Sequence, residues 1–206
     1  MTSKKSEFFV VVFAALCLIV TVVGLYSLKN NRDTKQMISA VISVGVENTT
    51  HANFINRIVI GTNFEPKNKV AVFLGPYELL LGLDGFMLND SNEYYVFIDW
   101  GFYLSLEQSE REALIAHELG HKIYRPSLIE NIQLDIIHGL RGYVDLETKH
   151  SQITTKYQVK ADTFAAKKTS PEKVISLLNK IRIDRNGYDY KTRIENLNKL
   201  KQGQAP

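Results

Sequence analysis

Two histidines and a glutamate at a fixed spacing are the residues of this chain best suited to chemistry. They lie in the run from His117 to His121, which reads His-Glu-Leu-Gly-His, an H-E-x-x-H pattern. Residues four apart share one face of a helix, so His117 and His121 can direct two imidazole nitrogens at one point, as tetrahedral Zn²⁺ requires. Glu118 can take a proton from a metal-bound water and return it to a leaving amine. The pattern predicts a zinc peptidase centre.

The residues around the motif favour the helix that this chemistry needs. Ser109 to Glu112 is a capping-box pattern just upstream, and Ser105 to Gln108 is an earlier one. Ile115 and Leu119 form an apolar pair suited to a core, and Pro126 predicts that the helix ends before it. The alternative is a buried helix whose histidines are only hydrogen-bonded.

A catalytic zinc site usually has three protein ligands and a water, so two histidines are not enough. Possible further donors are Glu130, Asp135, His138, Asp145, Glu147, His150, Gln158 and Asp162. No H-x-x-G-x-x-H continuation follows His121, so the metzincin pattern does not apply. His51, His138 and His150 are predicted to be surface or hydrogen-bonded histidines rather than ligands. With the metzincin pattern absent, the third ligand would instead be a carboxylate from a later helix.

Three segments, in order, resemble the HtpX-like membrane gluzincin peptidases, a family that includes the CAAX prenyl proteases. They are Ser109–Lys122 with H-E-x-x-H, Gln158–Ala165 in the place of an E-x-x-x-D segment, and Arg193–Leu197 with R-I-x-x-L. The resemblance covers about half of the chain, roughly from Leu104 to Leu200. It implies zinc-dependent peptide hydrolysis, with membrane or misfolded proteins as one possible class of substrate.

The resemblance also implies roles for single residues. His117 and His121 match the zinc ligands, Glu118 matches the general base, and Asp162 matches the carboxylate that holds a ligand histidine in its metal-binding tautomer. Gln158 stands where the family has its third ligand, a glutamate, and an amide oxygen is a weaker zinc ligand than a carboxylate. Gln158 could bind weakly, Asp162 could act as a substitute ligand, or the site could have lost its metal.

The N-terminal part of the chain reads as a membrane anchor. Residues 8–28 include no charged side chain and as a helix would span roughly 31 Å, about one hydrocarbon core. A cleaved signal peptide is the main rival, but its apolar core is usually only about 7–15 residues. The charges that flank the segment are nearly equal, so the side of the membrane stays open. They are Lys4 and Lys5 before it and Lys29, Arg32 and Lys35 after it.

Composition limits the remaining possibilities. The chain has 206 residues, a net charge of +3 and no long basic run, which gives nucleic-acid binding no support. With the anchor set aside, about 175 residues remain, enough for one domain with a sizeable core. The single cysteine, Cys17, lies in the apolar segment, so no disulfide holds the domain together.

We therefore predict three parts: an anchor at 1–29, a linker with an amphipathic helix at 30–50, and a metallopeptidase domain at 51–206. Short apolar runs predict strands, and longer periodic segments predict helices from about 151, from Pro171 and over 191–200. The predicted strands are Ile58–Ile60, Val70–Leu74, Leu79–Leu81 and Tyr94–Ile98. The expected fold is α+β and zincin-like, a small sheet packed on the H-E-x-x-H helix, with one sheet edge able to hold an extended peptide.

The function predicted from the sequence is a single-pass, membrane-anchored, zinc-dependent metalloendopeptidase. Its partners would be a peptide or protein substrate and the membrane, with no nucleic acid. The alternative is an inactive, membrane-tethered binding or sensing module that keeps the fold, and Gln158 in place of a glutamate motivates it.

Overall fold

The structure is a computed structural model that describes residues 32–60, 62, 69–76, 85–90, 93–127, 129–131, 133–134, 144–181 and 190–203, with the backbone alone for 144–150. The chain divides into two compact units, Met1–Ala40 and Val41–Pro206. A helix covers 32–44, as predicted for the linker. Among the described residues no helix has the length and apolar character to cross a membrane, and the predicted anchor at 8–28 lies outside them.

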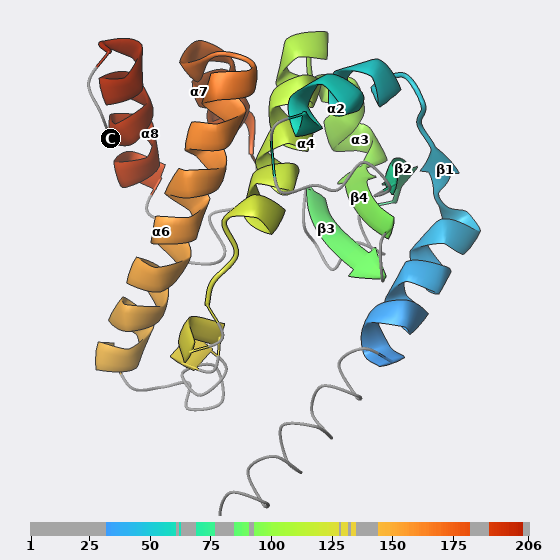
Figure 1. Cartoon of the computed structure of the whole chain (residues 1–206), viewed down its shortest axis with the longest axis horizontal. Helices are drawn as coiled ribbons and strands as arrows, with labels where there is room; N and C mark the ends of the chain where they lie inside the picture. The colour runs from blue at the N-terminus through green and yellow to red at the C-terminus, as the bar shows by residue number, and fades with distance from the viewer. Residues whose placement is uncertain are drawn as a thin grey trace, which may run out of the picture. The chain divides into compact units, whose positions relative to one another are not determined.

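The second unit confirms the α+β class: a four-stranded mixed sheet is followed by several helices (Figure 1). The strands are β1 (Val46–Glu47), β2 (Lys69–Gly75), β3 (Gly85–Asp90) and β4 (Glu93–Asp99). Their spatial order is β1-β2-β4-β3, with β2 and β4 parallel and the two outer strands antiparallel to their neighbours. The helices are α2 (Ala52–Val59), α3 (Trp100–Ser105), α4 (Gln108–Ile123), α6 (Val144–Lys168), α7 (Pro171–Lys180) and α8 (Tyr190–Lys201).

The two faces of the sheet enter different apolar clusters because successive side chains of a strand point to opposite faces. Val96 and Ile98 of β4 pack with the helices in the main core, whereas Phe97 between them packs on the other face. There Phe97 meets Phe73 of β2 and Val41, all three buried. The central strands are thus buried on both faces, which fixes β4 and the helices that follow it.

A short cap joins β4 to the helices. Asp99 ends the strand, and its carboxylate accepts a hydrogen bond of 2.6 Å from the backbone N–H of Phe102, which caps α3. The helix α4 then begins at Gln108, after Glu107 rather than after the predicted Ser109. Glu110 accepts the backbone N–H of Glu107 at 2.7 Å, so a glutamate at the third helical position closes the first turn.

The helix α4 lies between the sheet and the C-terminal helices α6, α7 and α8 (Figure 1). Ile115 and Leu119 are fully buried, as predicted for the apolar pair of the motif helix. Glu110 accepts hydrogen bonds from Ser176 Oγ at 2.6 Å and Lys180 Nζ at 2.7 Å, which ties the start of α4 to α7. A helix held on both sides can present side chains at fixed positions.

Two predictions of local structure are wrong. The run Ile58–Ile60 is not a strand, because α2 includes Ile58 and buries Phe54, Ile55 and Ile58, a helical spacing. The strand β3 was not predicted, since Gly85 and the polar residues after it were read as turns. The predicted strand at 79–81 lies outside the described residues. The predicted starts and spans of α7 and α8 and the strands at 70–74 and 94–98 are confirmed.

Candidate metal centre

A contact between two helix backbones brings the candidate residues together. A Cβ atom built on Gly120 of α4 would lie 2.8 Å from Ala161 Cα and 3.1 Å from Ala161 O of α6. Only a residue without a side chain permits this approach. Because the helices touch here, His117 and His121 on α4 lie opposite residues of α6 one turn apart.

The two histidines of the motif converge as the helical spacing predicts. Their Nε2 atoms are 3.1 Å apart, and the rings are nearly perpendicular, at 86°. Two nitrogen ligands of a tetrahedral zinc ion, each about 2.0–2.1 Å from the metal, would lie about 3.3 Å from each other. The spacing of the two nitrogens is compatible with a shared metal ion and is also that of a direct hydrogen bond between the two rings.

Asp162 holds the ring of His117 from behind. Its Oδ1 atom accepts a hydrogen bond of 2.8 Å from His117 Nδ1, which leaves Nε2 as the nitrogen that can bind a metal. The same carboxylate accepts two bonds from Arg193 of α8, from Nε at 2.6 Å and Nη2 at 2.8 Å. Both oxygens of Asp162 are thus engaged, so the geometry favours Asp162 as support for His117 over Asp162 as a ligand.

The electrostatics around Asp162 keep it ionised. Burial opposes its ionisation, but the hydrogen bond from Arg193, the charge and hydrogen bond of His117 and the charge of Arg193 outweigh burial and lower its pKa to about 2. A carboxylate that stays charged at neutral pH is the acceptor that the His117 Nδ1–H needs.

Glu118, the predicted general base, is 8% exposed and lies beside the histidine pair in sequence. Burial raises the pKa of Glu118, and the nearby charges of His117 and Arg193 oppose this only in part. A carboxylate with a raised pKa takes up and releases protons more readily near neutral pH than an exposed one does. This property suits the proton transfers predicted for Glu118.

His121 lies in surroundings that keep it neutral. Burial lowers its pKa to about 3, with help from the charge of His117, while Asp162 and a hydrogen bond to the Gln158 side chain act in the opposite direction. A histidine must be neutral to bind a metal, so no proton has to be removed from His121 first. The contact also brings the Gln158 side chain to the ring of His121.

The donors that the described residues offer a zinc ion are the two imidazoles and, in contact with His121, one amide. Within the described part of the chain, no three histidine, cysteine, aspartate or glutamate side chains are grouped to hold a metal. This agrees with the sequence, because the residue beside His121 on α6 is Gln158 rather than a carboxylate. The donor set is therefore weaker than two histidines and a glutamate.

The other possible donors named from the sequence do not join this group in the part that the structure describes. Glu130 instead accepts hydrogen bonds from Ser127 Oγ at 2.8 Å, Lys156 Nζ at 2.9 Å and Tyr157 Oη at 2.5 Å. It therefore connects the segment after α4 to α6. Asp135 and His138 lie outside the described residues, and Asp145, Glu147 and His150 lie where only the backbone is described.

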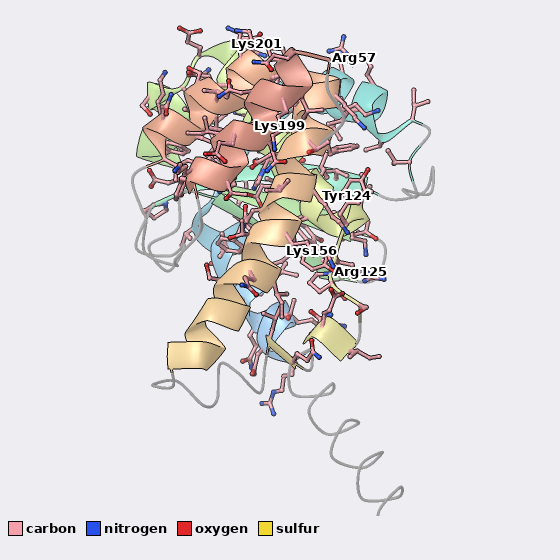
Figure 2. All side chains as sticks on the ribbon, turned by 90° about the vertical axis from the view of Figure 1, so that its left-hand side faces the viewer. Arg57, Tyr124, Arg125, Lys156, Lys199 and Lys201 are labelled. Atoms are coloured by element: carbon pink, nitrogen blue, oxygen red, sulfur yellow. The ribbon has the colours of Figure 1, made fainter. Side chains whose placement is uncertain are left out.

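A groove of about 600 Å³ opens on α6, and neither His117 nor His121 lines it. Residues of α6 line it together with Tyr124 and, from α8, Thr192 and Asn196. Figure 2 shows Tyr124 and Lys156, both of which line this groove, on the face where α6 is in front. None of the candidate metal or catalytic residues is among its lining residues. The groove is therefore not the metal centre.

Sequence reasoning missed one buried polar cluster. His51 is fully buried, and its Nε2 atom lies 2.9 Å from Tyr103 Oη, which also accepts a bond of 3.0 Å from Asn48 Nδ2. Among the described residues His51 Nδ1 has no hydrogen-bond partner. The sequence predicted a surface or hydrogen-bonded histidine here, and His51 is hydrogen-bonded, but no local signal indicated its full burial, since histidine is seldom fully buried.

We expect His51 to make the fold sensitive to acid. Burial lowers its pKa below the ordinary 6.5, the charge of Glu112 opposes this, and the charge of Arg111 adds to it. Below pH 6.5 the unfolded chain binds a proton that the folded chain refuses, so the free energy of unfolding falls as the pH drops and is fully retained above that value. In His51→Gln this loss should be smaller. The slope of the free energy of unfolding against pH should differ between the two proteins by up to the value for one bound proton.

The measurement is urea unfolding at several pH values between 7 and 5 for the parent and His51→Gln. His121, whose pKa is also lowered, contributes equally to both proteins, so the difference between their slopes reports His51 alone. Lys199→Gln, at an exposed position of α8, serves as the control and should keep the slope of the parent. Equal slopes for all three proteins would show that His51 is not responsible.

Comparison of the chain with protein-family models, with curated proteins and with solved structures gives no match.

Proposed function

We propose that this chain is a zinc-dependent metalloendopeptidase of the HtpX-like gluzincin type, with a zincin-like domain anchored to the membrane by residues 8–28. The observation that carries the proposal is the approach of His117 Nε2 and His121 Nε2 to 3.1 Å while Asp162 holds the other nitrogen of His117. An isolated structural histidine pair needs no carboxylate behind it, whereas metal-binding histidines commonly have one.

The chain's own residues divide the chemistry between them. Zinc bound by His117 and His121, with the Gln158 amide as the third protein donor, would supply Lewis-acid polarisation of the scissile carbonyl and of a water. Glu118 takes the proton of the attacking water and passes it to the leaving nitrogen. The low exposure of Glu118 keeps bulk water away from this transfer and preserves its raised pKa.

The sheet offers a place for the substrate backbone. In the described sheet β3 is an edge strand, paired only with β4. A Cβ on Gly85 of β3 would touch Leu114 Cδ1 of α4 at 3.8 Å, so this edge runs beside the motif helix. An extended peptide that pairs with β3 by backbone hydrogen bonds would lie along α4. The substrate class is then an unfolded or extended protein segment near the bilayer.

The test is hydrolysis of an unstructured protein such as casein by the full chain, purified in detergent. We expect slow cleavage at internal bonds that stops with a chelator and returns with added zinc. Cleavage that persists unchanged in excess chelator would show that the activity comes from another source. Mass spectrometry of the fragments identifies the bonds that are cut.

One observation favours a second function. The proposed metal centre has an amide where the third ligand of such a peptidase is a carboxylate. The described residues include no further histidine or carboxylate in its place. A membrane-tethered binding or sensing module could keep the helices and lose hydrolysis. It predicts no cleavage with any divalent metal and a domain that stays folded in chelator, so the same experiment separates the two functions.

A further inference from the structure

Arg193 is a buried cation that reaches the histidine pair through one intervening residue, Asp162. It lies on α8, is 2% exposed, and grips Asp162 with Nε and Nη2 through bonds of 2.6 Å and 2.8 Å. Asp162 in turn accepts the Nδ1–H of His117 at 2.8 Å. Three helices therefore contribute one side chain each to a line of hydrogen bonds that ends at His117 Nδ1, on the ring whose Nε2 atom faces His121.

The two-pronged contact fixes the orientation of the carboxylate. A guanidinium bonds a carboxylate in the plane of both groups, so Asp162 cannot rotate without breaking a charge-assisted bond. The Oδ1 atom is shared between Arg193 Nη2 and His117 Nδ1, which places the acceptor for the imidazole at one point. A carboxylate buried without this partner would be costly to keep charged and free to turn.

We propose that Arg193 is a positioning residue that sets the metal affinity of the site by holding Asp162 against His117. Arg193 acts through Asp162 and touches neither the metal nor the substrate. Its influence is large in this chain because Gln158 supplies no negative charge, so a larger share of the affinity depends on the two imidazoles. The inference rests on the proposed zinc site but not on peptide hydrolysis.

The experiment measures the zinc dissociation constant of the full chain in detergent by competition with a chromophoric chelator. We expect Arg193→Met to weaken zinc binding by roughly 10- to 100-fold, the usual effect of losing an outer partner of a ligand histidine. Arg193→Lys should recover part of the affinity, because it restores the charge but not the paired hydrogen bonds. The control is Lys199, an exposed residue of α8 that is labelled in Figure 2. The Lys199→Met protein should bind zinc like the parent.

A double-mutant cycle separates positioning from general damage to the fold. In the background of Asp162→Asn, the further change Arg193→Met should alter zinc affinity little, because the residue through which Arg193 acts is already lost. If Arg193→Met does not fold, Arg193→Lys and the cycle built on it decide the question. Parent affinity in the folded Arg193 variants, or equal effects of the change in both backgrounds, would overturn the proposal.

Failure of this proposal and failure of the proposed function give different results. A parent that binds zinc through this line of residues but cuts no protein keeps the role of Arg193 and removes the peptidase. If the parent cuts casein and the Arg193 variants bind zinc as the parent does, the peptidase proposal is kept and the role of Arg193 is lost. A folded parent that binds no zinc overturns the role of Arg193.

Discussion

Glu118→Gln is expected to reduce peptide hydrolysis by about 10²- to 10⁴-fold, the usual contribution of a general acid and base. The amide has nearly the same shape as the carboxylate but cannot take a proton from water at neutral pH. Since Glu118 is not among the converging metal donors, zinc content and folding should stay at the level of the parent. The measurement is the initial rate of casein cleavage, with zinc content determined on the same samples.

Glu112→Gln is the matched control, since it makes the same change on the same helix at a residue that contacts Gln108 Nε2 at 3.1 Å rather than the histidine pair. It should leave the rate unchanged. A fully active Glu118→Gln protein would refute the role of Glu118 and with it the proposed mechanism.

Gly120→Ala is expected to damage the fold and the metal centre together. Its new methyl carbon would lie 2.8 Å from Ala161 Cα, and because the nearest atoms include backbone, no side-chain rotation relieves the contact. Alanine is the better helix former by about 1 kcal/mol, so an uncrowded site would be stabilised. We expect overpacking to exceed this gain and to lower the free energy of unfolding by about 1–3 kcal/mol.

Separation of α4 from α6 would also pull Asp162 away from His117, because Gly120 and Ala161 lie on the same two helices as these residues, Ala161 directly before Asp162. Zinc affinity should therefore fall in the folded fraction of Gly120→Ala. Gly75→Ala is the control, since a Cβ there has nothing within 4 Å in the described residues. An increase in stability for Gly120→Ala, measured by urea unfolding, would contradict the close packing of the two helices.

The convergence of His117 and His121 could be predicted from the sequence, because helical spacing alone determines it. For the α6 half, residue types alone left Gln158 and Asp162 among several possible donors, and the resemblance singled them out. Nothing local indicates that Ala161 must meet Gly120, since helix contacts depend on the whole packing of the domain. The sequence leaves Asp162 open as ligand or as support, and the geometry favours support because Arg193 bonds both of its oxygens.

The strands at 70–74 and 94–98 were predicted correctly, and the two errors in the sheet have a different cause. A short apolar run such as Ile58–Ile60 looks the same in a strand and at the end of a helix, so its periodicity does not distinguish the two structures. In β3 the backbone pairing with β4 determines the structure, although Gly85, Asn89 and Asp90 are poor strand formers. His51 illustrates the same limit, because its burial follows from the packing of α2 on α3 and α4 rather than from its neighbours in sequence.

Zinc content of the purified full chain is the measurement that decides whether the proposed metal centre exists. We expect about one zinc per folded chain, lost in His117→Ala and His121→Ala, which remove the two proposed imidazole ligands. Gln158→Ala should weaken binding as the loss of a neutral third donor would, and Asp162→Ala should weaken it through His117. A folded parent that holds no zinc after dialysis against micromolar zinc would contradict the metal centre and leave the binding module as the function of this chain.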